Sequence, residues 1–364
     1  MNEFVYVELD GVSTINTILA SDTPKIKFRS GYYYIDEPLV VDNYHIIEGV
    51  ARDCGHGTEI VASSNFPMGA PMVIINNTGV EISHVTFNGA GRAGTGIFSG
   101  PEMLGNSQLE TTRYGLRFQD VQVFNCRNCG IDLCVFMCTL DRVNVKDCGQ
   151  GFFIHGIEDM SDGYYYVGGT TLLLSQCYVK NCPIAGFEIA NMNYSAMICC
   201  AADDCGMTGP DCDLQGKSLS NGYGYSYRFY GCHTMHVTSC GAEASNYTLF
   251  FTLCSNFCIN NFSEYNPTNR NWITSAPIVM VQCGYMTFQN CIFEGKKDIT
   301  LDDSSTKRVI LIANGSQPSR RISFNYCSVE QRMLSEGMLH TESGDLTSDH
   351  IFGDASGNSV INYG

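Results

Sequence analysis

A short unit of alternating residues recurs along the chain and constrains its fold more than any other feature. The segment "TLLLSQCYVKNC" (171–182) aligns without a gap over "YSAMICCAADDC" (194–205). The same frame accepts "MCTLDRVNVKDC" (137–148) and "FQDVQVFNCRNC" (118–129), and its first part accepts "MHVTSCGAE", "YMTFQNCIFE" and "RISFNYCSVE". Such self-similarity predicts a repeat architecture, in which each unit buries its apolar face against its neighbours.

The alternation within a unit predicts short strands with one buried face. Ile322 and Phe324 alternate with polar residues, a corner follows at 325–326, and Cys327 and Val329 continue the apolar side. The segments "GFFIH" (151–155) and "GFEIA" (186–190) supply a third strand. Coils of about 20–25 residues with three short strands are typical of a parallel β-helix.

The spacing of the repeat is not constant. Units recur at 19 residues from Arg127 to Lys146 and at 23 residues from Lys180 to Asp203, with longer spacings where a loop is inserted.

The 19 cysteines are expected to be free and buried rather than paired. Their number is odd, no export signal precedes them, and most are flanked by aliphatic residues. "CRNC" (126–129) resembles half a zinc site, but no second pair with matching spacing and histidines follows. We therefore expect no metal site and no cofactor.

Charge and hydropathy exclude several classes of function. The formal net charge of −16 is opposite to what a nucleic-acid binder needs. No secretion signal opens the chain and no apolar run is long enough to insert in a membrane, so we expect synthesis in the cytoplasm. Phosphate-loop, serine-hydrolase and zinc-protease motifs are also missing from the sequence.

The opening "KIKFRSGYYYIDEPLVV" (25–41) and "HIIEGVARDCGHGTEIVAS" (45–63) resemble the first coils of the pectate-lyase-like right-handed β-helix family. The later "CYVKNC…GFEI…CCAADDCG…YRFYGCHTMHVTSCGAEAS" is similar to repeats of phage and prophage tail-spike proteins, which are polysaccharide depolymerases. The resemblance covers about residues 25–330. It implies an all-β, right-handed, single-stranded parallel β-helix, a homotrimer and association with a phage virion.

Three regions are expected along the chain. Residues 1–24 form an N-terminal cap, in which "GVSTINTILAS" (11–21) has apolar residues at helical spacing and predicts a short capping helix. Residues 25–330 form the β-helix. Residues 331–364 form a C-terminal coil, a cap or a trimer contact.

The repeat frame predicts a row of charged residues on the outside of the coils. Cys240, Cys291 and Cys327 point inward, so the glutamates three residues later point outward. In this frame the outward position holds a basic series followed by an acidic one: Arg127, Lys146, Lys180, Asp203, Glu243, Glu264, Glu294 and Glu330.

Carboxylates on neighbouring coils suit glycoside hydrolysis. Coils stack about 4.8 Å apart, and paired carboxylates at about 5–5.5 Å suit a retaining glycosidase, whereas about 6.5–9.5 Å suits an inverting one. We predict Glu243, paired with Glu264 or Asp203, as the catalytic residues, because the long loop 206–226 lies beside them. A solvated acidic face without catalysis remains the simpler alternative.

Two inserted loops and one glutamate are predicted to contact the glycan. Aromatic faces stack on sugar rings and carboxylates hold hydroxyls. The candidates are Glu158, Asp159, Tyr164 and Tyr165 in loop 155–169, Arg270 and Trp272 in loop 266–277, and Glu294. Packing against the β-helix wall or another subunit is the alternative for these loops.

The sequence therefore predicts a tail-spike-like β-helix that binds a polysaccharide and cleaves it by hydrolysis. Three alternatives stay open: a receptor-binding protein without activity, a β-helix transferase such as the fructan-converting fructotransferases, and a structural appendage. Hydrolysis is favoured over β-elimination. A lyase of this fold usually requires calcium-binding carboxylates and a basic residue together on one sheet, whereas here the basic and acidic outward positions are separated along the axis.

Overall fold

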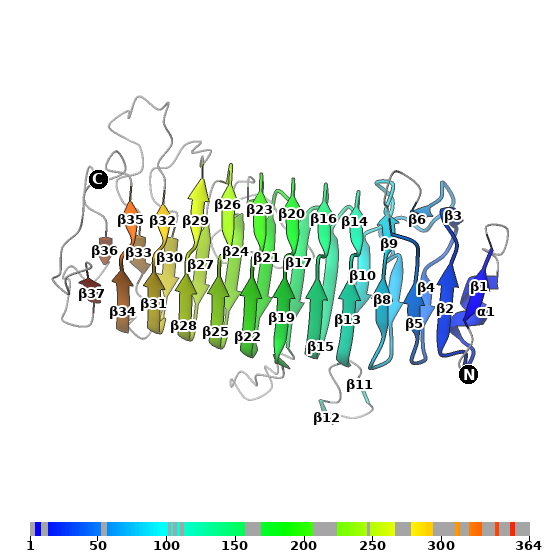
Figure 1. The fold of residues 1–364 in the computed structure, drawn as a ribbon, viewed down its shortest axis with the longest axis horizontal. Coiled ribbons are helices and arrows are strands. Elements are labelled where there is room, and N and C mark those ends of the chain that lie inside the picture. Colours follow the sequence, from blue (N-terminus) through cyan, green and yellow to red (C-terminus); the bar gives the residue numbers. More distant parts are fainter. Residues whose placement is uncertain are drawn as a thin grey trace. The chain divides into compact units, whose positions relative to one another are not determined.

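The computed structural model describes most of the chain up to residue 293 and shorter segments beyond. The described residues are 4–8, 14–51, 57–100, 103–104, 108–109, 113–156, 169–206, 224–245, 248–265, 278–293, 310–313, 320–329, 339–341 and 350–353. They fall into two compact units, Met1–Cys182 (unit 1) and Pro183–Gly364 (unit 2). In both units the long sheets consist of parallel strands (Figure 1).

Unit 1 is built from coils that each contribute strands to three sheets. Sheet A contains β1 (Val5–Val7), β2 (Lys25–Phe28), β5 (Ile46–Glu48), β8 (Glu81–Ser83), β13 (Arg113–Gln119), the second half of β15 (Cys129–Asp141) and β19 (Leu172–Ser175). Sheet B contains β3 (Gly31–Ile35), β6 (Thr58–Ala62), β9 (Val85–Asn88), β14 (Gln122–Phe124), β16 (Asn144–Lys146) and β20 (Tyr178–Lys180). Sheet C contains β4 (Leu39–Val41), β7 (Val73–Ile75), β10 (Thr95–Ser99), the first half of β15 and β17 (Gln150–His155).

Unit 2 repeats the same three-sheet coil. Its sheet A contains β22 (Met192–Ile198), β25 (His233–Thr238), β28 (Ser255–Asn260), β31 (Gly284–Gln289), β34 (Arg320–Asn325) and β37 (His350–Gly353). Sheet B contains β23 (Ala201–Asp203), β26 (Gly241–Glu243), β29 (Ser263–Tyr265), β32 (Ile292–Phe293) and β35 (Ser328–Val329). Sheet C contains β21 (Ala185–Ala190), β24 (Tyr225–Tyr230), β27 (Leu249–Thr252), β30 (Ile278–Val281), β33 (Ile310–Ala313) and β36 (Leu339–Thr341).

Three short elements complete the description. A two-stranded antiparallel pair, β11 (Met103–Leu104) and β12 (Gln108–Leu109), and the two-residue strand β18 (Gly169–Thr170) lie in unit 1. The only helix of the described residues is α1 (Ile15–Leu19), within the segment predicted as helical, and it contacts β4. Ile15 and Leu19 are buried, whereas Val12 lies outside the described residues. That this helix caps the β-helix remains a prediction.

The parallel coil confirms the repeat, with one correction to its spacing. Val145 pairs with Val179, the 34-residue offset that the sequence frame predicts. The 19-residue spacing is wrong, because Phe124, not Arg127, pairs with Lys146, an offset of 22 residues. Cys126 rather than Cys129 therefore corresponds to Cys148. The sequence alone predicts the wrong spacing because either cysteine of "CRNC" can be aligned with Cys148.

Corners between strands are made by residues with left-handed backbone. Asn125, Asp147 and Asn181 have φ of 58°, 53° and 54° in unit 1, and Asn261 and Asn290 have 54° and 53° in unit 2. Asn and Asp tolerate this conformation better than most residues, because their short side chains hydrogen-bond locally. At such corners they also bridge adjacent coils: Asn181 Nδ2 donates to Asp147 Oδ1 at 2.8 Å.

The core consists of inward residues stacked along each unit. Phe229 stacks on Phe251 with ring centroids 5.2 Å apart, and Phe288 stacks on Phe324 at 4.5 Å. Tyr227 is fully buried, and its hydroxyl donates to the Gly241 carbonyl at 2.7 Å. This bond satisfies the one polar atom of an otherwise apolar side chain.

Every cysteine that the structure describes is free, as expected. Most are buried, including Cys240 and Cys291, whereas Cys258 and Cys327 are half-buried and Cys199 is exposed. Burial raises the pKa of the Cys138 thiol. The buried thiols therefore behave as small apolar core groups.

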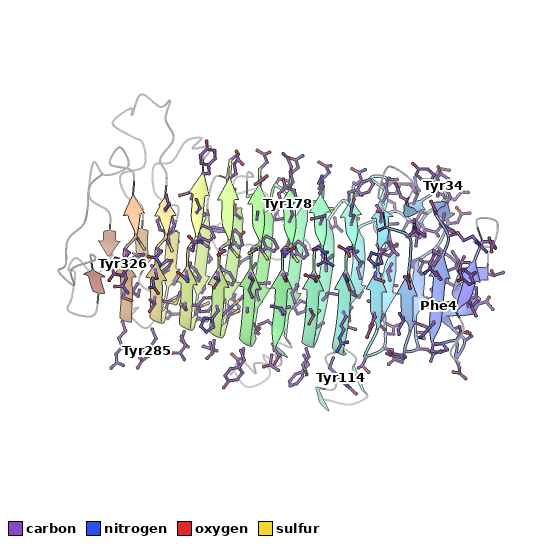
Figure 2. All side chains as sticks on the ribbon, viewed as in Figure 1. Phe4, Tyr34, Tyr114, Tyr178, Tyr285 and Tyr326 are labelled. Carbon is purple, nitrogen blue, oxygen red and sulfur yellow. The ribbon has the colours of Figure 1, made fainter. Side chains whose placement is uncertain are left out.

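Several tyrosines are exposed on the outer surface of the described residues. Tyr34, Tyr114, Tyr285 and Tyr326 are each more than half exposed and project outward from their strands and corners (Figure 2). Within the described ranges, no helix combines the length and apolar character needed to span a bilayer.

Candidate active site

Two carboxylates and a tyrosine form a row on the outside of sheet B in unit 2. The register pairs Asp203 with Glu243 and Glu243 with Tyr265, on the neighbouring strands β23, β26 and β29 (Figure 1). We call these three residues the outer row of unit 2. Neighbouring strands lie about 4.8 Å apart, so the two carboxylates are within reach of one glycosidic bond.

The inward residues of the same strands fix the direction of the outer row. Ala202 and Ala242 are buried in the core, so the residue that follows each of them points outward. Backbone hydrogen bonds continue past the strand ends, because Asp204 N donates to the Glu243 carbonyl at 3.0 Å. Glu243 is exposed, and its carboxylate forms no hydrogen bond or ion pair with a described residue. It is therefore available to a ligand.

Glu264, predicted to be outward and catalytic, instead points into the core. Its exposed fraction is 1%, and its carboxylate accepts a hydrogen bond from the Thr248 hydroxyl. The sequence frame failed at Glu264 because Phe262, rather than a cysteine, occupies the inward position before the strand. Glu264 follows this position by two residues instead of three and therefore lies on the inward face. Tyr265 takes the outward place, and its exposed fraction is 49%.

Arg127 is also displaced from its predicted position. Phe124 occupies the outward place in β14, where it pairs with Lys146, and Lys146 pairs with Lys180. We call Phe124, Lys146 and Lys180 the outer row of unit 1. Arg127 follows in the next corner, beyond the strand.

The other predicted contact residues lie outside the described part of the chain. They are Glu158, Asp159, Tyr164, Tyr165, Arg270, Trp272 and Glu294. Glu330 also lies outside the described residues. The contribution of loops 155–169, 206–226 and 266–277 to a site therefore stays a prediction.

Sequence reasoning missed a buried titratable cluster on sheet C of unit 1. His155 Nε2 lies 3.4 Å from Asp132 Oδ1, Nδ1 lies 2.9 Å from the Gly156 carbonyl, and the ring stacks on Phe153. Burial lowers the pKa of His155, but hydrogen bonds to Asp132 and Cys134 outweigh it and raise the pKa to about 10. The imidazole is therefore a cation at neutral pH. The sequence signal for this cluster is the alternation in "DLC" (132–134) and "FIH" (153–155), which places polar residues on the same face of two neighbouring strands.

Unit 2 has a related pair on sheet C. Arg228 Nη1 lies 3.1 Å from Glu188 Oε1, with both side chains 13% exposed, and the guanidinium lies over the Phe250 ring. In the described ranges, no cluster of three or more His, Cys, Asp or Glu side chains is arranged to hold a metal ion.

No protein-family model matches the sequence, and a comparison with curated proteins finds no match. Solved structures match in fold. The A-module of a mannuronan C-5 epimerase from Azotobacter vinelandii is 10% identical, with a TM-score of 0.63 over 97% of this chain and 91% of that one. The catalytic domain of a GH87 α-1,3-glucanase in complex with tetrasaccharides is 12% identical, with a TM-score of 0.61 over 99% and 69%. DFA-IIIase from Arthrobacter chlorophenolicus without its lid is 11% identical, with a TM-score of 0.60 over 100% and 97%.

These likenesses, together with the parallel sheets, establish the class of fold. The chain has the pectate-lyase-like right-handed parallel β-helix fold that the opening coils indicate. At 10–12% identity the comparison defines the fold and not the reaction.

Proposed function

We propose that this protein binds a polysaccharide and hydrolyses it with the two carboxylates of the outer row of unit 2. The observation that carries the proposal is the pairing of Asp203 with Glu243 on adjacent strands, with an exposed tyrosine on the next strand. Two of the structural neighbours are named as a glucanase and an epimerase of polysaccharides, which agrees with this class of substrate.

The spacing of the carboxylates favours the retaining mechanism. Neighbouring strands hold the two groups near the separation of about 5 Å that a nucleophile and a general acid require. Glu243 is central, exposed and next to Tyr265, so it protonates the glycosidic oxygen while the sugar ring stacks on the tyrosine. Asp203 then attacks the anomeric carbon, and water activated by Glu243 releases the sugar.

The decisive experiment compares Glu243→Gln with the wild type on polysaccharide substrates. We expect turnover to fall by at least about 100-fold, because a glutamine can neither donate nor accept the catalytic proton. Urea unfolding should change by less than about 1 kcal/mol, because the side chain is on the surface. Lys146→Met, at the corresponding position in unit 1, is the matched control and should retain activity. Full turnover by the Glu243→Gln variant would remove the site assignment.

Product analysis separates hydrolysis from the competing functions. Linear oligosaccharides support a depolymerase, unsaturated ends support a lyase, and cyclic disaccharides support a fructan transferase. A glycan that is bound and recovered intact supports a receptor-binding protein. The fructan transferase is the second candidate, because DFA-IIIase is among the structural neighbours and covers the whole chain.

The tail-spike character of the protein is a further part of the proposal. It rests on the resemblance of the repeats and implies a homotrimer associated with a phage tail. Light scattering of the purified chain tests it: a mass of three chains supports the trimer, whereas a stable monomer contradicts it.

A further inference from the structure

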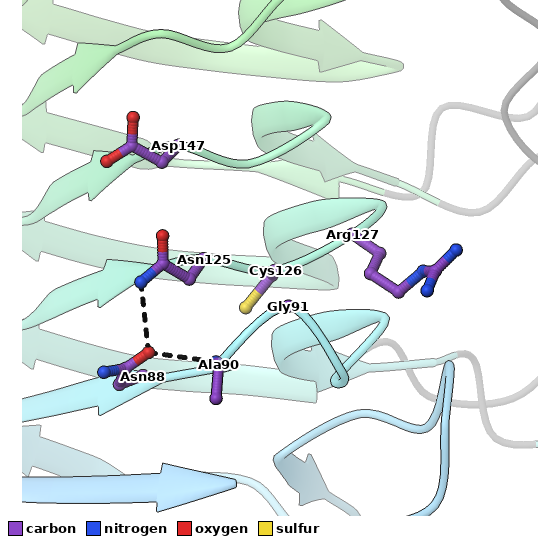
Figure 3. A pocket seen from close by; sticks show the side chains of 7 residues that line it. All are labelled: Asn88, Ala90, Gly91, Asn125, Cys126, Arg127 and Asp147. Carbon is purple, nitrogen blue, oxygen red and sulfur yellow. Dashed lines mark hydrogen bonds between the residues drawn. The ribbon is translucent and has the colours of Figure 1, made fainter.

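An open depression lies at the corner that follows sheet B in unit 1. Its volume is about 540 Å³, within the range of small-ligand sites. It spans three successive coils, because Asn88 ends β9, Asn125 follows β14 and Asp147 follows β16 (Figure 3). Ala90, Gly91, Cys126 and Arg127 complete its lining.

Small residues keep the depression open. The corner after β9 carries Ala90 and Gly91, both exposed and both with left-handed backbone, at φ of 51° and 67°. A Cβ added to Gly91 would meet no atom within 4 Å. The corresponding corners of the next coils carry the longer polar side chains of Asn125 and Asp147.

The amide of Asn125 is held in one orientation. Its Nδ2 donates to Asn88 Oδ1 at 3.3 Å, and Asn88 Oδ1 also accepts from Ala90 N at 2.9 Å. Asn88 Nδ2 in turn donates to Glu59 Oε1 at 3.0 Å. Asn125 Oδ1 is thereby turned toward Asp147 (Figure 3), and it has no partner among the described residues. An acceptor held in this way is pre-organised for a donor from a ligand.

A second acceptor and a donor complete the set. Asp147 Oδ1 accepts from Asn181 Nδ2 at 2.8 Å, and no described residue bonds to the other oxygen. Arg127 Nη1 lies 3.5 Å from Met68 Sδ, and its guanidinium pairs with no carboxylate of the described residues. The two acceptors match adjacent hydroxyl groups of a sugar ring, whereas the Arg127 guanidinium lies on the other side of the corner and points away from them (Figure 3).

We propose that this depression is a second glycan-binding site, which holds sugar hydroxyls through Asn125 and Asp147 without cleaving the chain. Among the described residues of its lining, Asp147 is the only carboxylate, so they do not include the acid and nucleophile pair of a glycosidase. The site shares with the proposed function only the class of ligand, and its existence does not depend on hydrolysis.

Calorimetric titration in the Glu243→Gln background tests the site without cleavage of the probe. The probes are an α-1,3-linked glucose tetrasaccharide and a mannuronan oligomer of the same length. We expect Asn125→Ala and Asp147→Asn each to weaken binding by about 5–10-fold, since each removes a hydrogen bond to the ligand. Asn261→Ala is the matched control, because Asn261 is also an exposed corner residue with φ of 54° and lies in unit 2.

The two probes distinguish neutral from acidic sugars. Mannuronan binding that weakens with salt, and loses this dependence in Arg127→Gln, would mean that Arg127 pairs with a sugar carboxylate. Salt-independent binding of the neutral probe would mean hydroxyl recognition alone. Either result supports the site. Absence of binding to both probes, or binding that Asn125→Ala and Asp147→Asn leave unchanged, would overturn it.

The outcomes remain separable from those of the proposed function. Wild-type turnover that disappears in Glu243→Gln, with binding insensitive to Asn125 and Asp147, removes the second site and leaves the hydrolase. Binding that depends on Asn125 and Asp147 in a protein without turnover removes the hydrolase and leaves the second site.

Discussion

The same position on sheet B carries opposite charge in the two units. In unit 1 the outer row holds Lys146 and Lys180, whereas in unit 2 it holds Asp203 and Glu243. The inward neighbours are apolar in both units, so the core fixes the polarity of this position but not its sign. A sign that folding leaves free can be selected for ligand binding, and the acidic row of unit 2 is the better candidate for glycan chemistry.

The units also differ in how they hold buried charge. Unit 1 has a pair that contains a histidine, His155 with Asp132, whereas the pair in unit 2 joins Arg228 to Glu188. On sheet B, unit 2 in addition has a carboxylate inside the coil, at Glu264. Substitutions at these positions test whether the contrast between the units is structural or functional.

The largest difference in stability is expected between substitutions of the inward glutamate and the outward glutamate of unit 2. Glu264→Ala should lower the free energy of unfolding by about 2–4 kcal/mol, because it leaves a cavity and a buried Thr248 hydroxyl without its acceptor. Glu243→Ala, one strand away, should change it by less than about 0.5 kcal/mol. Urea unfolding of both variants measures the difference. If Glu243→Ala were destabilising and Glu264→Ala were neutral, the assignment of Glu264 to the inward face and Glu243 to the outward face would be wrong.

The pH dependence of stability should be larger for the unit 1 pair. The pKa of His155 is raised to about 10, above its ordinary value near 6.5, so its protonation favours the folded state. This stabilisation is complete below about pH 6.5 and is lost as the pH rises toward 10, by roughly 1–3 kcal/mol. Unfolding of the wild type should show this loss between pH 6 and 10, and His155→Gln should not.

Arg228→Gln provides the comparison from unit 2. It should lower stability by a similar amount at pH 6 and pH 10, because this pair contains no histidine. A pH slope that survives in His155→Gln and vanishes in Arg228→Gln would contradict the assignment.

The sequence was sufficient for the fold but only partly for the site. Alternation and repeated cysteines locate the strands, because a stacked coil must place a small apolar group at the same inward position each time. The register of the outer row failed at Glu264 and Arg127, where the cysteine marker is replaced by Phe262 or duplicated in "CRNC". A period of two allows a one-residue slip to exchange the faces, and only backbone pairing removes that ambiguity.

Features that depend on several coils could not be read from the repeat. The depression beside Asn125 is lined by small residues, Ala90 and Gly91, at the corner after β9 and by polar residues, Asn125 and Asp147, at the next two corners. The cluster at His155 likewise needs the register of β15 against β17. Both are properties of neighbouring strands, and residues on those strands are more than 20 positions apart in the chain.

The smallest effect is expected at the corner ladders, where the two units again differ in charge. In unit 1, Arg142 donates to both oxygens of Asp120, at 2.6 and 3.1 Å, which lowers the pKa of that carboxyl. In unit 2, Asn261 donates to Ser239 with no charge involved. The ion pair is partly exposed to water, with side-chain exposed fractions of 43% and 31%, so Asp120→Asn should cost little at neutral pH. The cost should disappear as the pH falls below about 4, where Asp120 becomes protonated in the unfolded and then in the folded state. Thermal unfolding of both variants over a pH series measures this, and Ser239→Ala should show no such pH dependence. If the cost of both substitutions disappeared in acid, the charge of the Asp120 ladder would not be its cause.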